Sequence, residues 1–404
     1  MSGTTPHSSF SSAAVKRGSE WLRGMGAESD VVVSSRVRLA RNLAGLPFLG
    51  KATREQRQQI LEMCRDRLLT CGIAEKVLWI DVHTAPHLDR TLMVERHLIS
   101  KEHAKGVAGP AQSGGKNDGG PPAPAANAPS PPPPDSEAAA GGPVGEPRGV
   151  AISLPDEAVS VMVNEEDHLR LQVLLSGLEL TAAFARINDV DDRIEGLCTR
   201  SGKVLEYAFS QRFGYLTACP TNVGTGIRVS VMLHLPALKM TGEIDKVKRA
   251  TRDMSLAVRG YYGEGSEAAG EFYQISNQTT LGKPESVLLQ EFERDIIPQV
   301  IRYERTARTL LLEKRRRLLE DKVFRALGAL RHARLMTPEE AQVLLSDVRL
   351  GVVTGLIKDV TEQDVNQLIL LTQPAHLQRV LGKEMDQGER REARADMVRE
   401  RLKV

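Results

Sequence analysis

Residues 219–228 read CPTNVGTGIR and lead directly into the alternating segment 229–235, VSVMLHL. Alternation of apolar and polar residues is typical of a half-buried β-strand, and two closely spaced glycines let a backbone come near a ligand. Further upstream, residues 34–38 read SSRVR and residues 164–170 read NEEDHLR. These segments place arginines suited to phosphate and glutamates suited to a cation beside small residues. The combination indicates phosphoryl transfer and is hard to explain by packing alone.

The overall composition describes a globular chain without a dominant charge. Its 404 residues suffice for two domains with their own cores. The 54 Lys and Arg nearly balance the 52 Asp and Glu, so we expect neither a nucleic acid nor a membrane as partner. The 4 cysteines have no CxxC spacing, and no apolar run is long enough for a secretory signal or a bilayer span. We therefore expect a cytoplasmic protein.

Composition divides the chain into three regions: an N-terminal segment, residues 1–28, expected to be partly disordered; a catalytic domain, residues 29–305; and an α-helical unit, residues 306–404. Residues 104–148 hold eleven of the 21 prolines and no aromatic residue, which predicts a disordered insertion. A tolerated loop insertion is favoured over a tether or an SH3 ligand. The β-rich runs at residues 78–82 and 159–163 indicate that this insertion interrupts one sheet domain.

The helical character of the third region rests on its periodicity. Apolar residues recur at steps near three and four from about residue 306 onward. Residues 337–340, TPEE, match a capping box with proline at the first helical position.

The arginines suggest a polyphosphate site. Arg36 and Arg38 stand at i and i+2 after a β-rich run, so their side chains share one face of a continuing strand. Together with Arg170, Arg228 and Arg259 they match the charges of a nucleoside triphosphate. Solvated surface side chains remain the alternative for each, and Arg170 could instead form a helical i,i+4 ion pair with the glutamate four residues before it.

The nucleotide-binding motifs of other protein families do not fit this sequence. The chain lacks the P-loop GxxxxGK[ST] and the kinase motifs HRD and DFG, and in residues 263–268, GEGSEA, a glutamate stands where a dinucleotide pyrophosphate would lie. No His or Cys cluster has metal-ligand spacing, so a metal would most plausibly be Mg²⁺ carried on phosphates. Cys219 could be a buried filler and His97 a structural histidine.

Read together, SSRVRLARN at residues 34–42, NEEDHLR, CPTNVGTGIR, and RGYYGEGSE with ISNQTTLG at residues 259–282 resemble the phosphagen (guanidino) kinases. Their order and spacing resemble the bacterial protein-arginine kinases of McsB type. The resemblance implies an α+β fold: a phosphagen-kinase-like catalytic domain with an antiparallel sheet flanked by helices, and an α-helical C-terminal dimerisation and regulatory domain.

The resemblance also implies roles for individual residues, with ATP and Mg²⁺ as cofactors. Glu166 and Glu264 would hold the acceptor guanidinium, and Cys219 would lie near it as a modulator. The implied ATP-binding residues are Ser34, Ser35, Arg36, Val37, Arg38, His97, Arg170, Arg228, Val229, Ser230, Val231, Met232, Arg259, Gly260, Tyr261, Tyr262, Gly263 and Glu264.

The acceptor is expected to be an arginine side chain of a protein. Small-molecule phosphagen kinases have a helical domain ahead of SSRVR, whereas 33 residues precede Ser34 here. The resemblance further implies a homodimer, a Clp-type ATPase or protease, a stress repressor and an activator protein as partners. A kinase for a small guanidino compound such as free arginine and a non-catalytic phosphoarginine-binding adaptor are the alternatives.

One departure concerns the C-terminal RDxxRA motif, which binds phosphoarginine in this branch. The aligned residues 390–395 read RREARA. Arg390, Arg394 and Ala395 are retained, but Arg391 stands where aspartate is expected. The segment is therefore either a phosphoarginine site or a plain basic helix end.

Overall fold

The computed structural model describes residue 15 and residues 19–105, 145–197, 204–260, 269–278 and 280–403. Most of the expected insertion, residues 104–148, lies outside these residues, but its first two residues end helix α4 (Lys101–Lys105) and Arg148 is buried. The expected disordered N-terminus also lies partly outside them. Its described part is ordered, since Trp21 and Leu22 in the short helix η1 (Glu20–Leu22) are buried in the main core.

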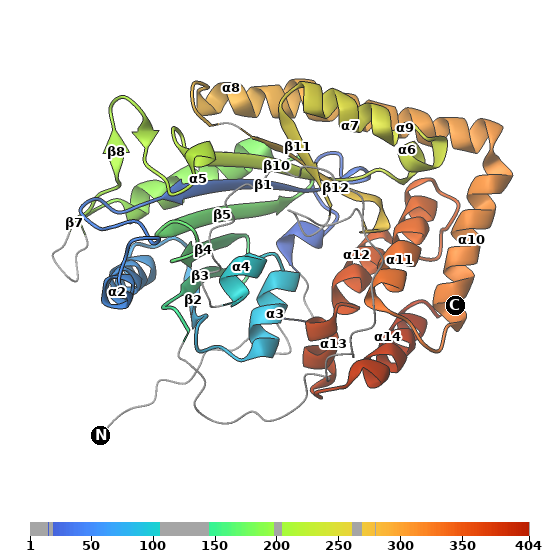
Figure 1. Ribbon diagram of the computed structural model, residues 1–404. Coiled ribbons are helices and arrows are strands. Elements are labelled where there is room, and N and C mark those ends of the chain that lie inside the picture. The colour runs from blue at the N-terminus through green and yellow to red at the C-terminus, as the bar shows by residue number, and fades with distance from the viewer. Residues whose placement is uncertain are drawn as a thin grey trace, which may run out of the picture.

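The fold is built on an eight-stranded antiparallel sheet in the order β11-β12-β10-β1-β5-β4-β3-β2 (Figure 1). The longest described strand, β1, pairs with β10 and β5 along most of its length. The strands are β1 (Val32–Arg41), β2 (Lys76–Asp81), β3 (Gly149–Leu154), β4 (Val159–Val163), β5 (Leu169–Ser176), β10 (Ile227–His234), β11 (Leu256–Arg259) and β12 (Phe272–Asn277). The expected antiparallel sheet is confirmed, with strands at all three segments that the sequence indicated.

Helices cover the sheet because each has one apolar stripe. Along α5 (Leu180–Ile194) the buried apolar residues recur at steps of three or four and pack on β1 and β5. Helix α2 (Arg54–Thr70) joins the same core, whereas α3 (His87–Glu95) packs in a second core against β2, β3 and β4. The remaining helices of this region are α6 (Pro236–Thr241), α7 (Ile244–Asp253), α8 (Glu285–Gln290), η4 (Glu291–Ile296) and α9 (Ile297–Lys314), with the short turns η2 (Pro220–Asn222) and η3 (Ala269–Glu271).

Two short hairpins extend the fold beyond the sheet. Strand β6 (Gly196–Leu197) pairs with β7 (Val204–Leu205), and β8 (Phe209–Ser210) pairs with β9 (Gly214–Tyr215). The β8–β9 hairpin lies at the upper left of Figure 1. It is therefore at the end of the molecule opposite the C-terminal helices.

The last part of the chain is helical, as predicted. It comprises α10 (Arg316–His332), α11 (Pro338–Val353), α12 (Glu362–Leu371), α13 (Pro374–Leu381) and α14 (Gln387–Arg401). The predicted capping box is present: Thr337 Oγ1 accepts from the backbone N–H of Glu340, whose side chain accepts from the backbone N–H of Thr337. The helical run begins earlier than expected, since α8, η4 and α9 follow one another from Glu285 to Lys314. No helix in the described part of the chain is long and apolar enough to cross a membrane.

Buried charged side chains join the C-terminal helices to the sheet. Arg349 of α11 donates to the carbonyl oxygens of Ser29 and Asp30 and contacts His234 Nδ1 of β10 at 2.9 Å. Because it is fully buried, its loss would leave several polar groups without a partner.

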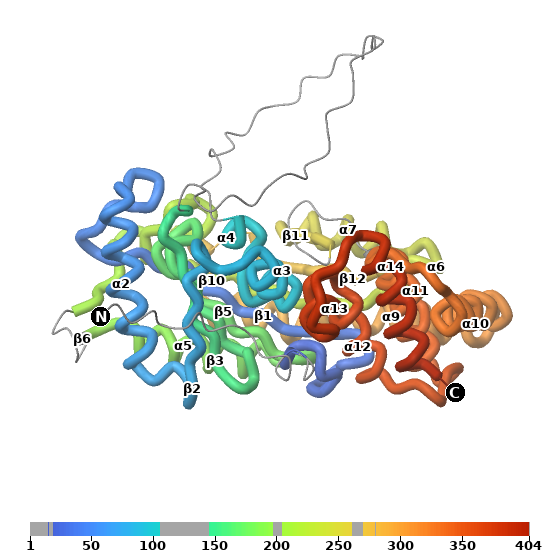
Figure 2. The backbone as a smooth tube through the Cα atoms, turned by 90° about the horizontal axis from the view of Figure 1, so that it is seen from below, coloured from blue at the N-terminus to red at the C-terminus, as the bar shows by residue number. Residues whose placement is uncertain are grey.

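A second joint connects α13 to α3, which lie side by side in Figures 1 and 2. The Glu95 carboxylate accepts hydrogen bonds from the backbone N–H groups of Ala375 and His376 and contacts His376 Nδ1 at 2.7 Å. Nε2 of the same histidine contacts Arg96 Nη1 at 3.1 Å. The first turn of α13 is thus held by a carboxylate two residues before His97.

The two segments that flank the insertion are hydrogen-bonded to each other. Arg148 Nη1 donates to the carbonyl oxygen of Glu102 at 2.7 Å, and His103 Nε2 contacts the carbonyl oxygen of Gly149 at 3.1 Å. The described chain before residue 106 is therefore held beside the described chain after residue 144.

Candidate active site

The register of the sheet places five arginines on one face. In β1, Arg36 lies opposite Ser230 of β10, and Arg38 lies opposite Arg228. On the other side of β1, Arg170 of β5 lies opposite Ala40, which shares its face with both β1 arginines. Through β12, the same alternation brings Arg259 of β11 to this face, because it pairs with Gln274, the partner of Met232. All five predicted phosphate ligands therefore lie on one face of the sheet, between β5 and the edge strand β11.

This arginine face has the electrostatics of an anion site. Burial and the neighbouring guanidinium groups lower the pKa of both Arg36 and Arg38. Nε of Arg38 is buried and has no hydrogen-bond partner among the described residues. Buried charges of one sign are costly unless a counter-charge joins them, and phosphate oxygens accept from guanidinium groups at two points. The face is therefore complementary to a polyphosphate.

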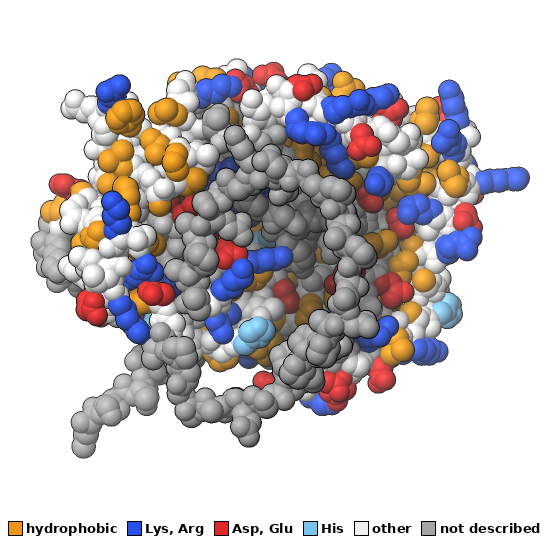
Figure 3. All heavy atoms as spheres, in the orientation of Figure 1, with side chains coloured by type: hydrophobic (Ala, Val, Ile, Leu, Met, Phe, Trp, Pro, Cys, Tyr) orange, Lys and Arg blue, Asp and Glu red, His pale blue; other side chains and the backbone are white. Residues whose placement is uncertain are grey.

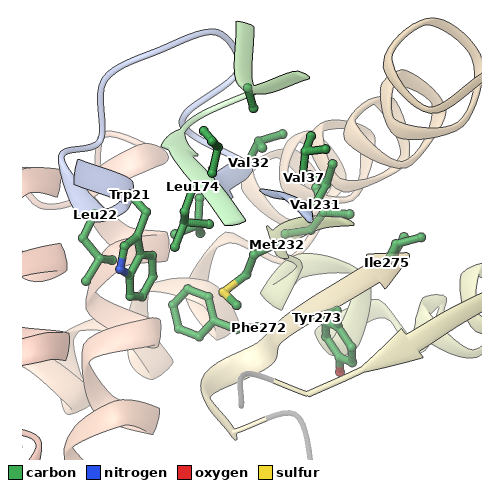
Figure 4. Packing of buried hydrophobic residues seen from close by; sticks show 14 of the residues in the cluster. Trp21, Leu22, Val32, Val37, Leu174, Val231, Met232, Phe272, Tyr273 and Ile275 are labelled. Carbon is green, nitrogen blue, oxygen red and sulfur yellow. The ribbon is translucent and has the colours of Figure 1, made fainter. Parts of the chain in front are cut away.

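A small cavity lies at the other end of the arginine face. Its lining consists of Trp21, Ser34, Arg36, His97, Leu174, Ser230, Met232 and Gln274. Trp21, Leu174 and Met232 converge from separate elements in Figure 4. Its volume of about 10 Å³ is that of a single water molecule, so it marks an aromatic-lined hollow at this end of the face and does not enclose a base.

His97 is held firmly at this cavity. Its backbone has a φ of 59°, its ring meets the Trp21 indole edge-on at 4.7 Å, and its carbonyl oxygen accepts from Gln172 Nε2. Burial, with the charges of Arg36 and Lys101, lowers the pKa of His97 to about 3. The imidazole is therefore neutral, and it can accept or donate one hydrogen bond without repelling a ligand cation.

Two adjacent glutamates in the turn before β5 differ in burial and in the direction of their pKa shifts. Glu165 is nearly buried, and its Oε1 accepts from Arg170 Nη1 at 2.8 Å and from Ser100 Oγ at 2.6 Å. Burial raises the pKa of Glu165, but Arg170 and Ser100 outweigh it and lower the pKa to about 2. Glu166 is exposed, and burial of part of its carboxylate, with the charge of Glu165, raises its pKa. Glu165 thus orients an arginine, whereas Glu166 is accessible to a ligand.

This arrangement settles the alternative for Arg170. The segment from Asn164 to His168 is a turn between β4 and β5, and Arg170 already belongs to the strand. Its ion pair is therefore with Glu165 across this turn, not a helical pair with Glu166. The role of Glu165 as the partner of Arg170 was not among the predicted ones.

The segment with Cys219 lies next to Glu166. The Asp167 carboxylate accepts from Asn42 Nδ2 and from the backbone N–H of Ala218, both at 2.6 Å. Cys219 is a free, half-buried thiol whose Sγ lies 3.0 Å from Thr221 Oγ1. Asn42 and Asp167 thus tie the cysteine loop to the glutamate turn, a link that the sequence analysis missed.

The glycines of residues 219–228 serve this loop. Gly226 has a φ of 68°, and a Cβ there would lie 2.7 Å from the carbonyl oxygen of Ala40. Gly224 has a φ of 114°, and its Cβ would lie 2.8 Å from that of Thr280. Side chains at either position would push the loop away from β1 and from residues 280–282.

Several predicted residues lie elsewhere or outside the described part of the chain. Tyr261, Tyr262, Gly263 and Glu264 are not among the described residues, and Gly260 is buried directly after β11. Four others have side chains on the opposite face of the sheet: Val37, Val229 and Val231 lie in the core, and Ser35 Oγ donates to the carbonyl oxygen of Gly177. These four could meet a nucleotide through main-chain atoms alone. Conversely, Trp21, Leu174 and Gln274 line the cavity without having been predicted.

The predicted phosphoarginine residues lie on α14, away from this face. Arg394 is 1% exposed, and its guanidinium donates to the carbonyl oxygens of Thr372, Met336 and Arg390. Ala395 is fully buried, and Arg390 Nη1 donates to the carbonyl oxygen of Met385. Arg394 therefore connects α12, α14 and the loop before α11.

The chain matches two family models in sequence. Residues 59–307 match the ATP:guanido phosphotransferase C-terminal catalytic domain, and residues 316–404 match the protein-arginine kinase McsB C-terminal domain. It is 40% identical over 386 residues to the protein-arginine kinase of Halothermothrix orenii, covering 96% of this chain and 97% of that one. The chain belongs to the protein-arginine kinases of the ATP:guanido phosphotransferase family.

The chain is also similar to other protein-arginine kinases and to solved structures of guanidino kinases. The enzyme of Symbiobacterium thermophilum is 41% identical over 387 residues, covering 95% of this chain and 96% of that one. Among solved structures, the chain is similar to lombricine kinase, with a TM-score of 0.53, 22% identity and coverage of 75% and 73%. It is also similar to the duplicated taurocyamine kinase of Schistosoma mansoni, with a TM-score of 0.52, 25% identity and coverage of 68% and 33%. These structures support the fold of a guanidino kinase.

Proposed function

We propose that this member of the protein-arginine kinase family transfers the γ-phosphoryl group of ATP to arginine side chains of proteins. The observation that carries the proposal is the order of groups along β1. A small aromatic-lined hollow lies at Ser34, guanidinium groups follow at Arg36 and Arg38, and the accessible carboxylate of Glu166 lies beyond the end of the strand. A triphosphate bound along this line presents its terminal phosphate to a group held by that carboxylate.

The residues divide the reaction between them. The Glu166 carboxylate grips the acceptor guanidinium and orients one of its nitrogens toward the γ-phosphorus. As the N–P bond forms and the bond from phosphorus to the β,γ-bridging oxygen breaks, the guanidinium loses a proton. The raised pKa of Glu166 fits it to accept this proton. Arg170, Arg228 and the β1 arginines stabilise the charge on the transferring phosphoryl group and on ADP.

We propose Mg²⁺ as a companion of ATP. The described residues contain no group of three or more His, Cys, Asp or Glu arranged to hold a metal ion. The proposal rests on the chemistry of ATP, whose phosphate oxygens bind Mg²⁺ while the ion keeps most of its waters. When bound, it would neutralise charge on the phosphate oxygens.

The setting and partners are part of the same proposal. By analogy with the family, phosphoarginine would mark clients or a stress repressor for a Clp-type protease in the cytoplasm, with an activator protein. A homodimer is supported by exposed apolar side chains on α9 and α10, where Tyr303, Leu318 and Phe324 are 55%, 53% and 48% exposed. Exposed large apolar side chains can contribute to interfaces between protein chains. Sedimentation velocity of the Leu318→Ser variant, expected to shift toward monomer, tests this assignment.

The activity is tested by incubating the protein with ATP, Mg²⁺ and an unfolded arginine-rich protein, with and without an activator. The expected product is acid-labile phosphoarginine, detected by mass spectrometry at neutral pH. In the Glu166→Gln variant, transfer should fall by about 100-fold or more while nucleotide binding persists. Turnover of free L-arginine in place of the protein would instead identify a small-molecule kinase, and absence of transfer under every condition would refute the proposal.

A further inference from the structure

The β8–β9 hairpin exposes two aromatic rings in a chain that has few of them. Aromatic residues make up 4% of the sequence, yet Phe209 and Phe213 are 59% and 44% exposed. Apolar side chains gather on the surface over this part of the fold, at the upper left of Figure 3. Exposed apolar groups that lie together commonly mark a binding surface.

The rings are supported by the hairpin itself. Phe209 meets Tyr215 edge-on at 5.3 Å, and the Arg212 guanidinium lies 4.9 Å from the centre of the Phe213 ring. Both side chains nevertheless remain about half exposed. A preformed aromatic surface costs little conformational entropy when it binds a partner.

The hairpin is fixed to the acceptor end of the active site. The backbone N–H of Leu216 donates to the carbonyl oxygen of Ala208, and the N–H of Ala208 donates to that of Asn42. Asn42 Nδ2 donates in turn to Asp167 Oδ1 and to the carbonyl oxygen of Leu216. Since Asp167 is the neighbour of Glu166, these bonds link the base of the hairpin to the turn that carries the Glu166 carboxylate.

We propose that Phe209 and Phe213 bind an apolar stretch of the client polypeptide next to the arginine being phosphorylated. This inference rests on the proposed function and identifies the class of protein substrate: an extended or unfolded segment with apolar side chains a few residues from the target arginine. When Glu166 holds that arginine, the client backbone must leave the site across its rim. The residues that continue from Cys219 back to the hairpin form part of that rim.

The chemistry of the surface selects the occupant. Folded proteins bury most of their aromatic and branched side chains, whereas unfolded chains expose them. A kinase with an aromatic platform beside its acceptor site therefore prefers arginines in unfolded segments, without any contact that reads a defined sequence.

The test uses two peptides of equal length with a single arginine, one flanked by Phe and Leu and one flanked by Ser and Gly. For the wild-type chain we expect a lower KM for the apolar peptide. In the double variant Phe209→Ser/Phe213→Ser this KM should rise about tenfold, an effect sized from partial burial of two rings. The kcat, the KM for ATP and the KM for the Ser/Gly peptide should not change.

A matched control is Leu335→Ser, which removes an apolar side chain of 50% exposure between α10 and α11. It should leave both peptide KM values unchanged. Equal preference for the two peptides in the wild type, or an unchanged preference in the double variant, would overturn the proposal. The proposal would also be overturned by a double variant that keeps its peptide preference but no longer self-associates in sedimentation, because the two rings would then contact a second copy of the chain.

Binding of the labelled apolar peptide, read by fluorescence anisotropy, separates this proposal from the proposed function. Phe-dependent binding in a protein that transfers no phosphate would support the docking surface and count against the kinase assignment. Phosphorylation of both peptides without Phe-dependent binding would do the reverse.

Discussion

Replacing Glu165 and Glu166 one at a time by glutamine should give opposite results, although the two are neighbours in sequence. Glu165→Gln removes a carboxylate that orients Arg170 from inside the fold. Glu166→Gln removes one that is exposed to solvent. The first should reduce stability and nucleotide binding, and the second should abolish transfer while preserving both.

The magnitude follows from the environment of Glu165. Its pKa falls from the ordinary 4.5 to about 2, and one pKa unit corresponds to about 1.4 kcal/mol. The ionised carboxylate therefore stabilises the fold by roughly 3 kcal/mol, a value close to the cost of breaking a buried pair. Because the folded-state pKa is lowered, this contribution is complete above about pH 4.5 and is lost as the pH falls toward 2. The raised pKa of Glu166 has the opposite sign, so at neutral pH its charge opposes folding.

Urea unfolding at pH 7 and at pH 4, followed by tryptophan fluorescence, measures these differences. We expect Glu165→Gln to lower the free energy of unfolding by about 3 kcal/mol at pH 7 and by less at pH 4. Glu166→Gln should not lower it, and titration calorimetry should show its ATP affinity intact. Equal stabilities of the two variants, or a larger loss for Glu166→Gln, would contradict the division of roles derived from the structure.

Three further substitutions test other parts of the site and its supports. Arg38→Met should weaken ATP binding by roughly 10- to 100-fold without lowering the urea midpoint, because it removes a buried charge that repels its neighbours; unchanged affinity in calorimetry would exclude Arg38 as a phosphate ligand. Glu95→Gln should cost about 1 to 3 kcal/mol of stability, because it weakens the hydrogen bonds that the buried carboxylate accepts from α13, and should raise the KM for ATP, because Glu95 lies two residues before His97; steady-state kinetics with wild-type KM would refute this coupling. Arg394→Met should cost about 2 kcal/mol by leaving buried carbonyl groups such as that of Thr372 without a donor; full stability with lost phosphoarginine binding would show a ligand site instead.

The sequence predicted those parts of the site that depend on local geometry. A strand periodicity of two is enough to place Arg36 and Arg38 on one face, and β1 includes both. The alternation after Gly226 likewise predicted β10. A capping box needs four consecutive residues, and the one that begins at Thr337 is present.

The parts that depend on tertiary contacts were beyond sequence reasoning. Trp21 lies in a segment expected to be partly disordered, and it is ordered because its indole packs on His97 and donates to the carbonyl oxygen of Arg96. The distinct roles of Glu165 and Glu166 arise from Arg170, which is near both in the sequence, and from Ser100, which is far from both and could not be anticipated. The sequence offered one signal for Trp21, namely a tryptophan shortly before the first strand. It does not indicate which loop the indole ring would contact.

The contacts of Glu102 with Arg148 and of His103 with Gly149 hold together the two segments that flank the insertion. Because these hydrogen bonds hold the two flanking segments together, the position of β3 does not depend on the length of the segment between them. Lengthening that segment adds only a slowly growing entropic cost. This part of the gene is thus open to enlargement, shortening or replacement by a reporter peptide without altering how β3 enters the sheet.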